Sequence, residues 1–350
     1  MSISHTLLNL ISDPDLALDL GTANTRIFAL GKGLVCDRPT LIRLDSESKS
    51  SGGNGSLNPV VSDDAGTCCV EFPAPLKGGV VADIDAAASL LRPVIRRSRG
   101  FGLRPPRVLA CTPTDATPQE VTALETSVKL AGASNVKVVP EPLAAAVGAG
   151  LDISSPYAQA LIDIGDGVTD IAFIRSGFVI DKAAVRLACG LLPPSLRRLV
   201  ASRYGVVLYS REAERVTREL GVVRACHVLG RTENALGIDR LSGRETCVTI
   251  SDEEVSEAIR PIVRFMMETV RHAFRRMPER VAAEVIEGGI LLTGGGACLP
   301  GMQDLISDVT GIEARVAANP LHAVINGASK MLETGAATGL WSSKASAIGL

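Results

Sequence analysis

A motif that occurs twice constrains the fold of this 350-residue chain more than any other feature. Asp19-Leu20-Gly21-Thr22-Ala23-Asn24-Thr25 follows the apolar run 16–18, and Asp163-Ile164-Gly165-Asp166-Gly167-Val168-Thr169 follows the apolar run 160–162. Both copies have the form strand, Asp-x-Gly-x-x-x-Thr, strand. The repeat therefore predicts two equivalent β-hairpins, each with an aspartate at the end of its first strand.

The residue types in the repeated turn suit phosphate binding. A tight turn between strands points successive backbone N–H groups into a concavity that attracts anions, and glycine lets a phosphate approach the backbone closely. Thr22 and Asn24 add side-chain donors, while Asp19 and Asp163 suit a hydrated Mg²⁺ that bridges phosphates. The alternative is two ordinary Gly/Asn hairpins that bind no ligand.

A third motif strengthens the nucleotide hypothesis. The apolar run 289–293 leads into Gly294-Gly295-Gly296-Ala297. A glycine triplet alone often marks only a loop, but beside two phosphate-binding hairpins it becomes a plausible floor for a nucleoside.

The rest of the chain alternates strand-length apolar runs with helical periods, which is typical of an α/β protein. Capping boxes predict helices that begin after Thr117 and after Ser251, the first ending near Gly132. The methionines of the second helix, at 266 and 267, are interpreted as core residues. Strands are predicted at Leu16–Leu20, Arg26–Leu30, Val108–Cys111, Val136–Val139, Ala160–Ile164, Ile171–Ile174 and Gly289–Thr293.

Composition excludes several classes of protein. Lys and Arg number 36 against 38 Asp and Glu, and a net charge of −2 argues against general nucleic-acid binding. Only 3% of residues are aromatic, which disfavours base-stacking platforms. The sequence has no run of 18 apolar residues and no evident secretion signal, so we expect no transmembrane helix and no export. Eight cysteines without a CxxC pair indicate reduced thiols and a cytosolic protein.

The three motifs, in this order, resemble those of the actin/Hsp70/sugar-kinase ATPase superfamily, and the chain as a whole resembles the MreB/Mbl family of bacterial actins. The supporting segments are 19–25, 31–33, 75–83, 140–150, 204–221, 289–300 and 320–327. This resemblance implies an actin-like ATPase fold of two similar halves, each a mixed sheet with flanking helices, and two smaller inserted subdomains. The implied boundaries are 1–39, 76–149 and 320–350 for subdomain IA, 40–75 for IB, 150–186 and 252–319 for IIA, and 187–251 for IIB.

The resemblance also implies ATP and Mg²⁺ as ligands and gives residue roles. Asp19 and Asp163 would hold Mg²⁺ through water, and Glu141 would position or activate the attacking water. The phosphates would be held by Gly21, Thr22, Ala23 and Asn24 on one side and by Gly165, Asp166, Gly167, Val168 and Thr169 on the other; Glu214, Thr217, Gly294, Gly295, Gly296 and Ala297 would form the nucleoside side.

Some positions depart from the family pattern. Asp166 replaces a glycine, Leu191 replaces an acid, and Pro193-Pro194 are expected to delay the helix that follows. Pro140 takes the place of a second glutamate and Thr217 that of a lysine, while 50–69 lacks the helix-forming residues of the subdomain that contacts the next subunit. Three alternatives therefore stay open: a slow filament-forming ATPase, a divergent paralogue that acts as a poorly hydrolysing scaffold, and a small-molecule kinase of the same superfamily.

The family also implies a membrane-facing edge. Phe101 and Leu103 lie in a segment rich in arginine, 96–107, which suits an anionic leaflet. A second candidate anchor is an N-terminal helix with Ile3, Leu7, Leu8, Leu10 and Ile11 on one side, and the alternative is a solvated basic loop. The resemblance thus predicts a cytoplasmic protein, peripheral on the inner membrane face, that forms filaments with copies of itself and organises cell-wall synthesis and cell shape with membrane proteins of the rod system.

Overall fold

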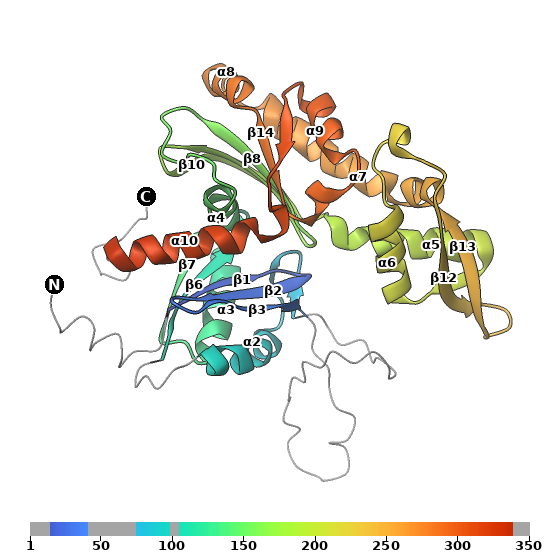
Figure 1. The fold of residues 1–350 in the computed structure, drawn as a ribbon, viewed down its shortest axis with the longest axis horizontal. Helices are drawn as coiled ribbons and strands as arrows, with labels where there is room; N and C mark the ends of the chain where they lie inside the picture. The colour runs from blue at the N-terminus through green and yellow to red at the C-terminus, as the bar shows by residue number, and fades with distance from the viewer. Residues whose placement is uncertain (1–14, 41–74, 99–104, 339–350) are drawn as a thin grey trace, which may run out of the picture. The chain divides into compact units, whose positions relative to one another are not determined.

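The computed structural model describes residues 15–40, 75–98 and 105–338 (Figure 1). The chain divides into two compact units, the first reaching Gly148 and resuming at Val324, the second running from Ala149 to Ala323. Residues 41–74 of predicted subdomain IB, the loop with Phe101 and Leu103, and the possible N-terminal helix lie outside the described residues. The four predicted subdomain boundaries stay a prediction.

The first unit is built on a five-stranded sheet with the order β3-β2-β1-β6-β7. All five residues of β1 (Leu16–Leu20) are buried, as expected of a central strand covered on both faces. It pairs antiparallel with β2 (Asn24–Ala29) and parallel with β6 (Arg107–Thr112). Outside these pairs lie β3 (Gly33–Pro39), antiparallel to β2, and β7 (Asn135–Pro140), parallel to β6.

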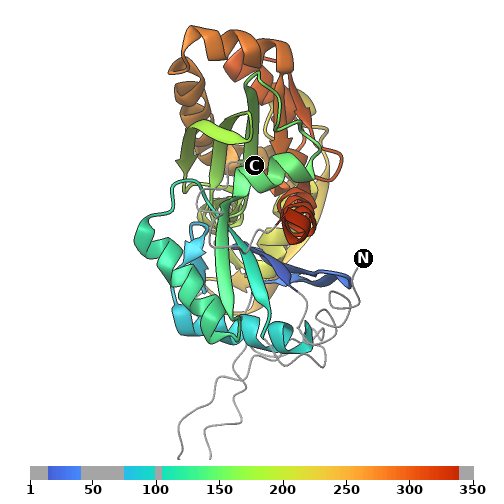
Figure 2. The ribbon, with the colours of Figure 1, turned by 90° about the vertical axis from the view of Figure 1, so that its left-hand side faces the viewer.

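Helices cover both faces of this sheet. Leu16, Leu18 and Leu20 join one core with α2 (Ile84–Ser98) and α3 (Pro118–Leu130). The other face is covered by α4 (Glu141–Gly148) and α10 (Ala323–Thr338) (Figure 2). A two-stranded hairpin of the same unit comprises β4 (Leu76–Lys77) and β5 (Val80–Val81).

The second unit repeats this arrangement, with the sheet order β10-β9-β8-β14-β15. Its central strand β8 (Gln159–Ile164) is antiparallel to β9 (Thr169–Arg175), as β1 is to β2. Antiparallel β10 (Phe178–Val185) lies beyond β9, and parallel β14 (Ile290–Thr293) and β15 (Ala314–Val316) lie on the other side. The predicted α/β architecture of two similar halves is therefore confirmed.

The second unit also carries a three-stranded antiparallel sheet, and one hydrophobic core runs through the whole unit. In that core the rings of Phe173 and Phe274 meet edge to face, with their centroids 5.2 Å apart. No helix in the described ranges is long and apolar enough to cross a membrane. The remaining α-helices and strands of the unit are α5 (Leu192–Tyr204), β11 (Val206–Leu208), α6 (Ser210–Leu220), β12 (Thr232–Asp239), β13 (Glu245–Ser251), α7 (Asp252–Arg275), α8 (Glu279–Gly288) and α9 (Met302–Thr310).

The predicted strands and both capping boxes are confirmed, with small shifts of the strand ends. Thr117 Oγ1 accepts the Glu120 N–H, and Ser251 Oγ accepts the Glu254 N–H. The expected delay of the helix at Pro193-Pro194 is wrong, because α5 already begins at Leu192. Both prolines lie in its first turn, where backbone N–H groups have no helical partner and their loss costs nothing.

Candidate functional site

The first repeated turn has a defined hydrogen-bond frame. The Gly21 N–H donates to the Asn24 carbonyl at 3.0 Å, which closes the turn between β1 and β2. Thr40, directly after β3, holds the turn, because its N–H donates to the Ala23 carbonyl and its Oγ1–H to the Gly21 carbonyl. The Gly79 N–H, from the turn between β4 and β5, donates to Thr22 Oγ1 at 3.1 Å. The predicted phosphate-binding turn is thus held rigid from two sides.

Asp19 lies where β1 ends, beside this turn, and is only 7% exposed. Its Oδ2 forms an ion pair with Arg26 Nη1 at 3.3 Å, and Arg26 Nε in turn contacts Asp37 Oδ1 at 3.1 Å. The carboxylate is therefore buried but paired with a cation.

Glu141 belongs to the same edge of the first sheet. It is the first residue of α4, directly after β7, and is 8% exposed. Because β1, β6 and β7 run parallel, with Leu18 level with Ala110 and Ala110 level with Val138, their carboxyl ends meet at one edge. The register brings Glu141 to the edge that carries the Gly21 turn, and a helix N-terminus favours an ionised carboxylate there.

The second turn repeats the first in detail. The Gly165 N–H donates to the Val168 carbonyl at 2.9 Å, the counterpart of the Gly21 bond. Here the turn is held by the segment after β10, since the Cys189 N–H donates to the Gly165 carbonyl and the Gly190 N–H to the Asp166 carbonyl. Thr169 is buried, and its Oγ1 has no hydrogen-bond partner among the described residues.

Asp163 ends β8 as Asp19 ends β1, and it is 8% exposed. Thr293, the last residue of β14, lies level with it in the parallel pair and donates its Oγ1–H to Asp163 Oδ1 at 3.0 Å. This bond fixes the carboxylate where the glycine triplet begins.

The triplet is glycine for a steric reason. A Cβ on Gly294 would lie 2.4 Å from the Ile164 carbonyl oxygen, and one on Gly296 would lie 2.2 Å from Ile164 Cγ2. Gly294 also has a φ of +80°, which L side chains rarely adopt. Gly295 has no such restraint, because the nearest atom, Leu321 Cδ2, would be 3.5 Å away. The first and third glycines therefore let this segment pack directly against the second hairpin.

The second turn, Asp163 and the glycine triplet form the half-site of the second unit, and Asp166 is its unusual group. Its Oδ2 lies 2.8 Å from where a Cβ of Gly190 would be, so the carboxyl packs over that glycine. Burial raises the pKa of the Asp166 carboxyl above its usual range, and the charge of Glu214 raises it further. Burial also raises the pKa of the neighbouring Cys189 thiol to about 12, helped by the charges of Asp166 and Cys298, so this cysteine stays protonated.

Helix α6 completes the second half-site. Thr217 is 5% exposed, and its Oγ1 has no hydrogen-bond partner within the described part of the chain. The end of α6 lies beside the residues after the triplet, since the Val223 N–H donates to the Pro300 carbonyl at 3.1 Å. The predicted residues of this unit, 165–169, Glu214, Thr217 and 294–297, are thus brought to one region.

Sequence reasoning missed several residues that support the site: Thr40, Thr293, and the Cys189-Gly190 segment as a partner of the second turn. No local signal reveals them, because each acts through a contact with a distant segment. Within the described ranges no cluster of three or more His, Cys, Asp or Glu could hold a metal ion by itself. Each half-site combines a backbone nest for anions with one buried carboxylate, which suits phosphate and a largely hydrated cation.

Comparison with known proteins gives consistent results. The family model described as MreB/Mbl protein matches residues 13–339. Cell shape-determining protein MreB of Escherichia coli (strain K12) is 33% identical over 333 residues, covering 91% of this chain and 93% of that protein. Mbl of Bacillus subtilis (strain 168) is 31% identical over 323 residues, covering 91% of this chain and 96% of that protein.

Solved structures agree in fold. The crystal structure of MreB 5 of Spiroplasma citri bound to AMPPNP has a TM-score of 0.81 at 28% identity and covers 93% of this chain and 98% of its own. The MamK double helical filament has a TM-score of 0.72 at 19% identity, covering 91% and 99%, and supports the fold alone. The predicted actin-like ATPase fold is confirmed. With the duplicated hairpins and a family match over nearly the whole chain, this protein belongs to the MreB/Mbl family.

Proposed function

We propose that this protein binds ATP with Mg²⁺ through its two hairpins and assembles into filaments that determine cell shape. The observation that carries the proposal is the repeated turn. In each copy a glycine N–H donates a hydrogen bond to the carbonyl three residues later, at 3.0 Å in one sheet and 2.9 Å in the other. Two sheets with the same strand order present this turn beside a buried aspartate. Duplication of an anion nest with its carboxylate suits a ligand that carries several phosphates.

The residues present fit ATP. The backbone N–H groups of residues 22–24 and 166–168 would bind phosphate oxygens, and the unpartnered Thr217 Oγ1 offers a buried hydrogen-bonding group on the nucleoside side. Asp19 and Asp163 would hold Mg²⁺ through water, and the bound ion would offset the negative charge of the phosphates. Glu141 would orient the attacking water and accept its proton. Related MreB5 structures of Spiroplasma citri contain AMPPNP and ADP, which supports nucleotide binding.

Assembly and location form the second part of the proposal. The curated relatives MreB and Mbl are named as cell shape-determining proteins, and MamK, which shares the fold, was solved as a double helical filament. We infer that filaments of this protein lie on the inner face of the cytoplasmic membrane, with Phe101 and Leu103 in the leaflet, and organise cell-wall synthesis there. Weak apolar contacts of single subunits would add up along a filament.

A specific observation bears on how the second turn would bind phosphate. The Asp166 carboxyl lies in the second phosphate-binding turn, and an ionised carboxylate there repels phosphate. Together with the loss of an acid at Leu191, this added carboxylate keeps a poorly hydrolysing scaffold as the second candidate. The rate of phosphate release distinguishes it from the first.

Calorimetry of ATP binding with and without Mg²⁺ tests the hairpin assignment. Asp19→Ala and Asp163→Ala should each lose most of the Mg²⁺-dependent gain in affinity. Asp37→Ala is the matched control, because Asp37 shares Arg26 with Asp19 but lies outside the turn. If Asp19→Ala and Asp163→Ala keep the Mg²⁺ dependence of the parent, the assignment is wrong.

Phosphate release and pelleting then separate the two candidates. Glu141→Gln should bind ATP normally but release phosphate about tenfold more slowly or worse, the loss expected for a positioned base. A parent that pellets with ATP but releases no phosphate is a scaffold.

Co-sedimentation with anionic liposomes tests the membrane anchor. It should be lost in the Phe101→Ser, Leu103→Ser double variant, whereas loss only on deletion of residues 1–9 would assign the anchor to the N-terminus.

A further inference from the structure

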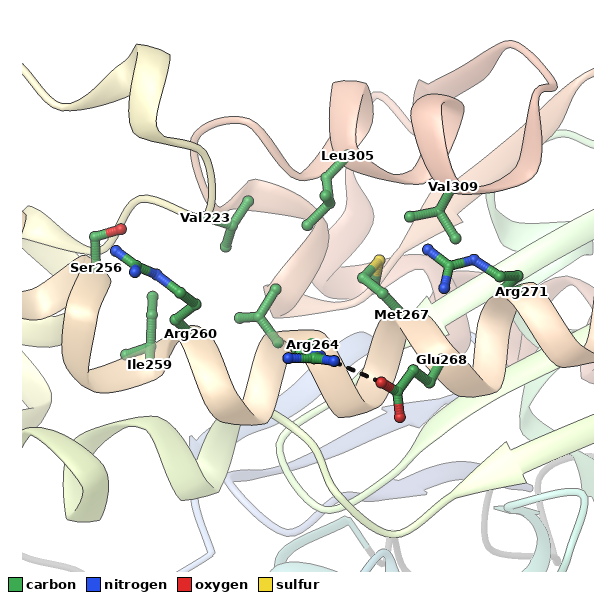
Figure 3. A pocket seen from close by; sticks show the side chains of 11 residues that line it. Val223, Ser256, Ile259, Arg260, Arg264, Met267, Glu268, Arg271, Leu305 and Val309 are labelled. Carbon is green, nitrogen blue, oxygen red and sulfur yellow. Dashed lines mark hydrogen bonds and ion pairs between the residues drawn. The ribbon is translucent and has the colours of Figure 1, made fainter.

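A groove of about 440 Å³ lies between α7 and α9 in the second unit (Figure 3). Its size is within the range of ligand-binding clefts. It has no part in the proposed nucleotide site, because none of its lining residues belongs to the hairpins, the glycine triplet or α6. Its apolar lining consists of Ile259, Val263 and Met267 of α7, Leu305 and Val309 of α9, and Val223.

The groove arises from the spacing of side chains on the two helices. Positions 259, 263 and 267 recur every four residues along α7 and form one stripe, and Leu305 and Val309 are likewise four apart on α9. Leu305, Val309 and Val223 pack on the core but are only partly buried, so they leave apolar surface in the groove. Ser256, a small buried residue, keeps one end open.

Arginines flank this apolar stripe. Arg264 Nε pairs with Glu268 Oε1 at 3.3 Å, the dashed line of Figure 3. Arg260 and Arg271, at opposite ends of the groove in Figure 3, form no hydrogen bond or ion pair with any residue that the structure describes. They are eleven residues apart on α7, which is about 16 Å or three helical turns.

Acidic residues of the neighbouring helix do not compensate these two arginines. Asp308 of α9 pairs with Arg224 at 3.0 Å, and Asp304 approaches Arg224 at 3.9 Å and His227 at 3.7 Å. The lining residues therefore comprise three arginines and one glutamate, a net charge of +2 around an apolar floor.

We propose that this groove docks an amphipathic α-helix of a partner protein, with an apolar face flanked by two acidic residues about three turns apart. The apolar surface open to such a helix comes from the partly buried Val223, Leu305 and Val309, because Ile259, Val263 and Met267 are themselves buried in the core. Helix-in-groove recognition places apolar anchors at three- and four-residue spacing on the docked helix. Each unpaired arginine can bind one carboxylate in a bidentate manner. A single lipid offers charge at one end only, whereas the two arginines require two anions about 16 Å apart, which a helix with acids eleven residues apart provides.

The test uses the full chain and a fluorescently labelled designed peptide that is helical, with a leucine stripe and two glutamates eleven residues apart. Anisotropy titration should show saturable binding to the parent. The Arg260→Glu, Arg271→Glu double variant should bind at least tenfold more weakly. A matched peptide with lysines in place of the two glutamates should show the reverse preference and bind the double variant more tightly than the parent. Arg275→Glu is the control, an exposed arginine of α7 outside the groove.

As a control for folding, the Arg260→Glu, Arg271→Glu double variant must melt at the temperature of the parent and bind ATP as the parent does. Leu305→Ser tests the apolar floor independently, and we expect it to bind both peptides more weakly. Equal binding of the two peptides, or equal binding by parent and double variant, would overturn the proposal. So would a groove that captures anionic vesicles but not the peptide, which indicates a lipid site. If the double variant binds the peptides as the parent does but sediments differently in the absence of peptide, the groove is instead a contact between copies of this protein.

Discussion

The glycine triplet allows a stringent test of the second half-site, because its three members face different surroundings within one segment. Gly294→Ala would place a Cβ 2.4 Å from the Ile164 carbonyl oxygen and 2.6 Å from Asp163 Oδ1. Gly296→Ala would place one 2.2 Å from Ile164 Cγ2. Gly295→Ala meets nothing closer than 3.5 Å and serves as the matched control.

The expected losses of stability follow from these contacts. At Gly294 the backbone angles, φ 80° and ψ 172°, lie in a region nearly restricted to glycine, and a side chain there costs about 1–3 kcal/mol. Overpacking against the second hairpin adds about 1–3 kcal/mol at Gly294 and a similar amount at Gly296. Gly295→Ala should be neutral or stabilising by up to about 1 kcal/mol, through the unfolded chain.

Thermal unfolding followed by circular dichroism, with ATP affinity measured in parallel, checks this order. A loss of about 1 kcal/mol in unfolding free energy lowers the melting temperature by about 2–4 °C. Gly294→Ala should therefore melt about 5 °C or more below the parent, and Gly296→Ala should melt between Gly294→Ala and the parent. Both should bind ATP·Mg²⁺ less tightly because they displace Ile164 or Asp163, while Gly295→Ala keeps the affinity of the parent. If Gly295→Ala is as damaging as Gly294→Ala, the close packing inferred for the triplet is wrong.

Two further predictions concern stability. The raised pKa of Asp166 means that the folded state holds its proton more tightly than the unfolded state, so this group stabilises fully below its ordinary pKa and less as pH rises through the folded value. Asp166→Asn should therefore melt above the nucleotide-free parent at pH 7.5, with the gap closing towards pH 4; a constant gap argues against the assignment. Gly327→Ala would place a Cβ 1.7 Å from the Ala144 carbonyl oxygen, where α10 crosses α4, and should lower the melting temperature by about 5 °C or more. Gly288→Ala, with nothing within 4 Å of the added Cβ, should change it little, and equal effects of the two would contradict the close approach of the helices.

The sequence predicted best what short segments determine by themselves. Each hairpin depends on a bond from a glycine N–H to a carbonyl three residues later, so the motif alone was sufficient to find it. Capping boxes work in the same way, which explains why the starts of α3 and α7 were placed correctly. The strands β12 and β13 were missed for the opposite reason. Most of their residues are exposed or partly buried, with only a few buried positions such as Ala235 and Ile250, and they offer no apolar run.

Contacts between distant segments were out of reach. Thr22 receives its hydrogen bond from Gly79, 57 residues away, and Asp163 receives one from Thr293, 130 residues away. Sheet order brings such pairs together, and no local pattern in the sequence records sheet order. The residues that hold the site rigid are therefore harder to find than the residues that form it.

The departures at Asp166 and Leu191 show how this limit affects interpretation. Compared position by position with the family pattern, the chain gains one carboxylate in the second turn and loses another 25 residues later, as two unrelated changes. In the structure the Asp166 carboxyl packs over Gly190, the residue directly before Leu191. The gained carboxylate thus lies next to the segment that has lost one, and it comes from the turn between β8 and β9. Because Gly190 has no side chain, the exchange causes no steric conflict, and an alanine at 190 would exclude it.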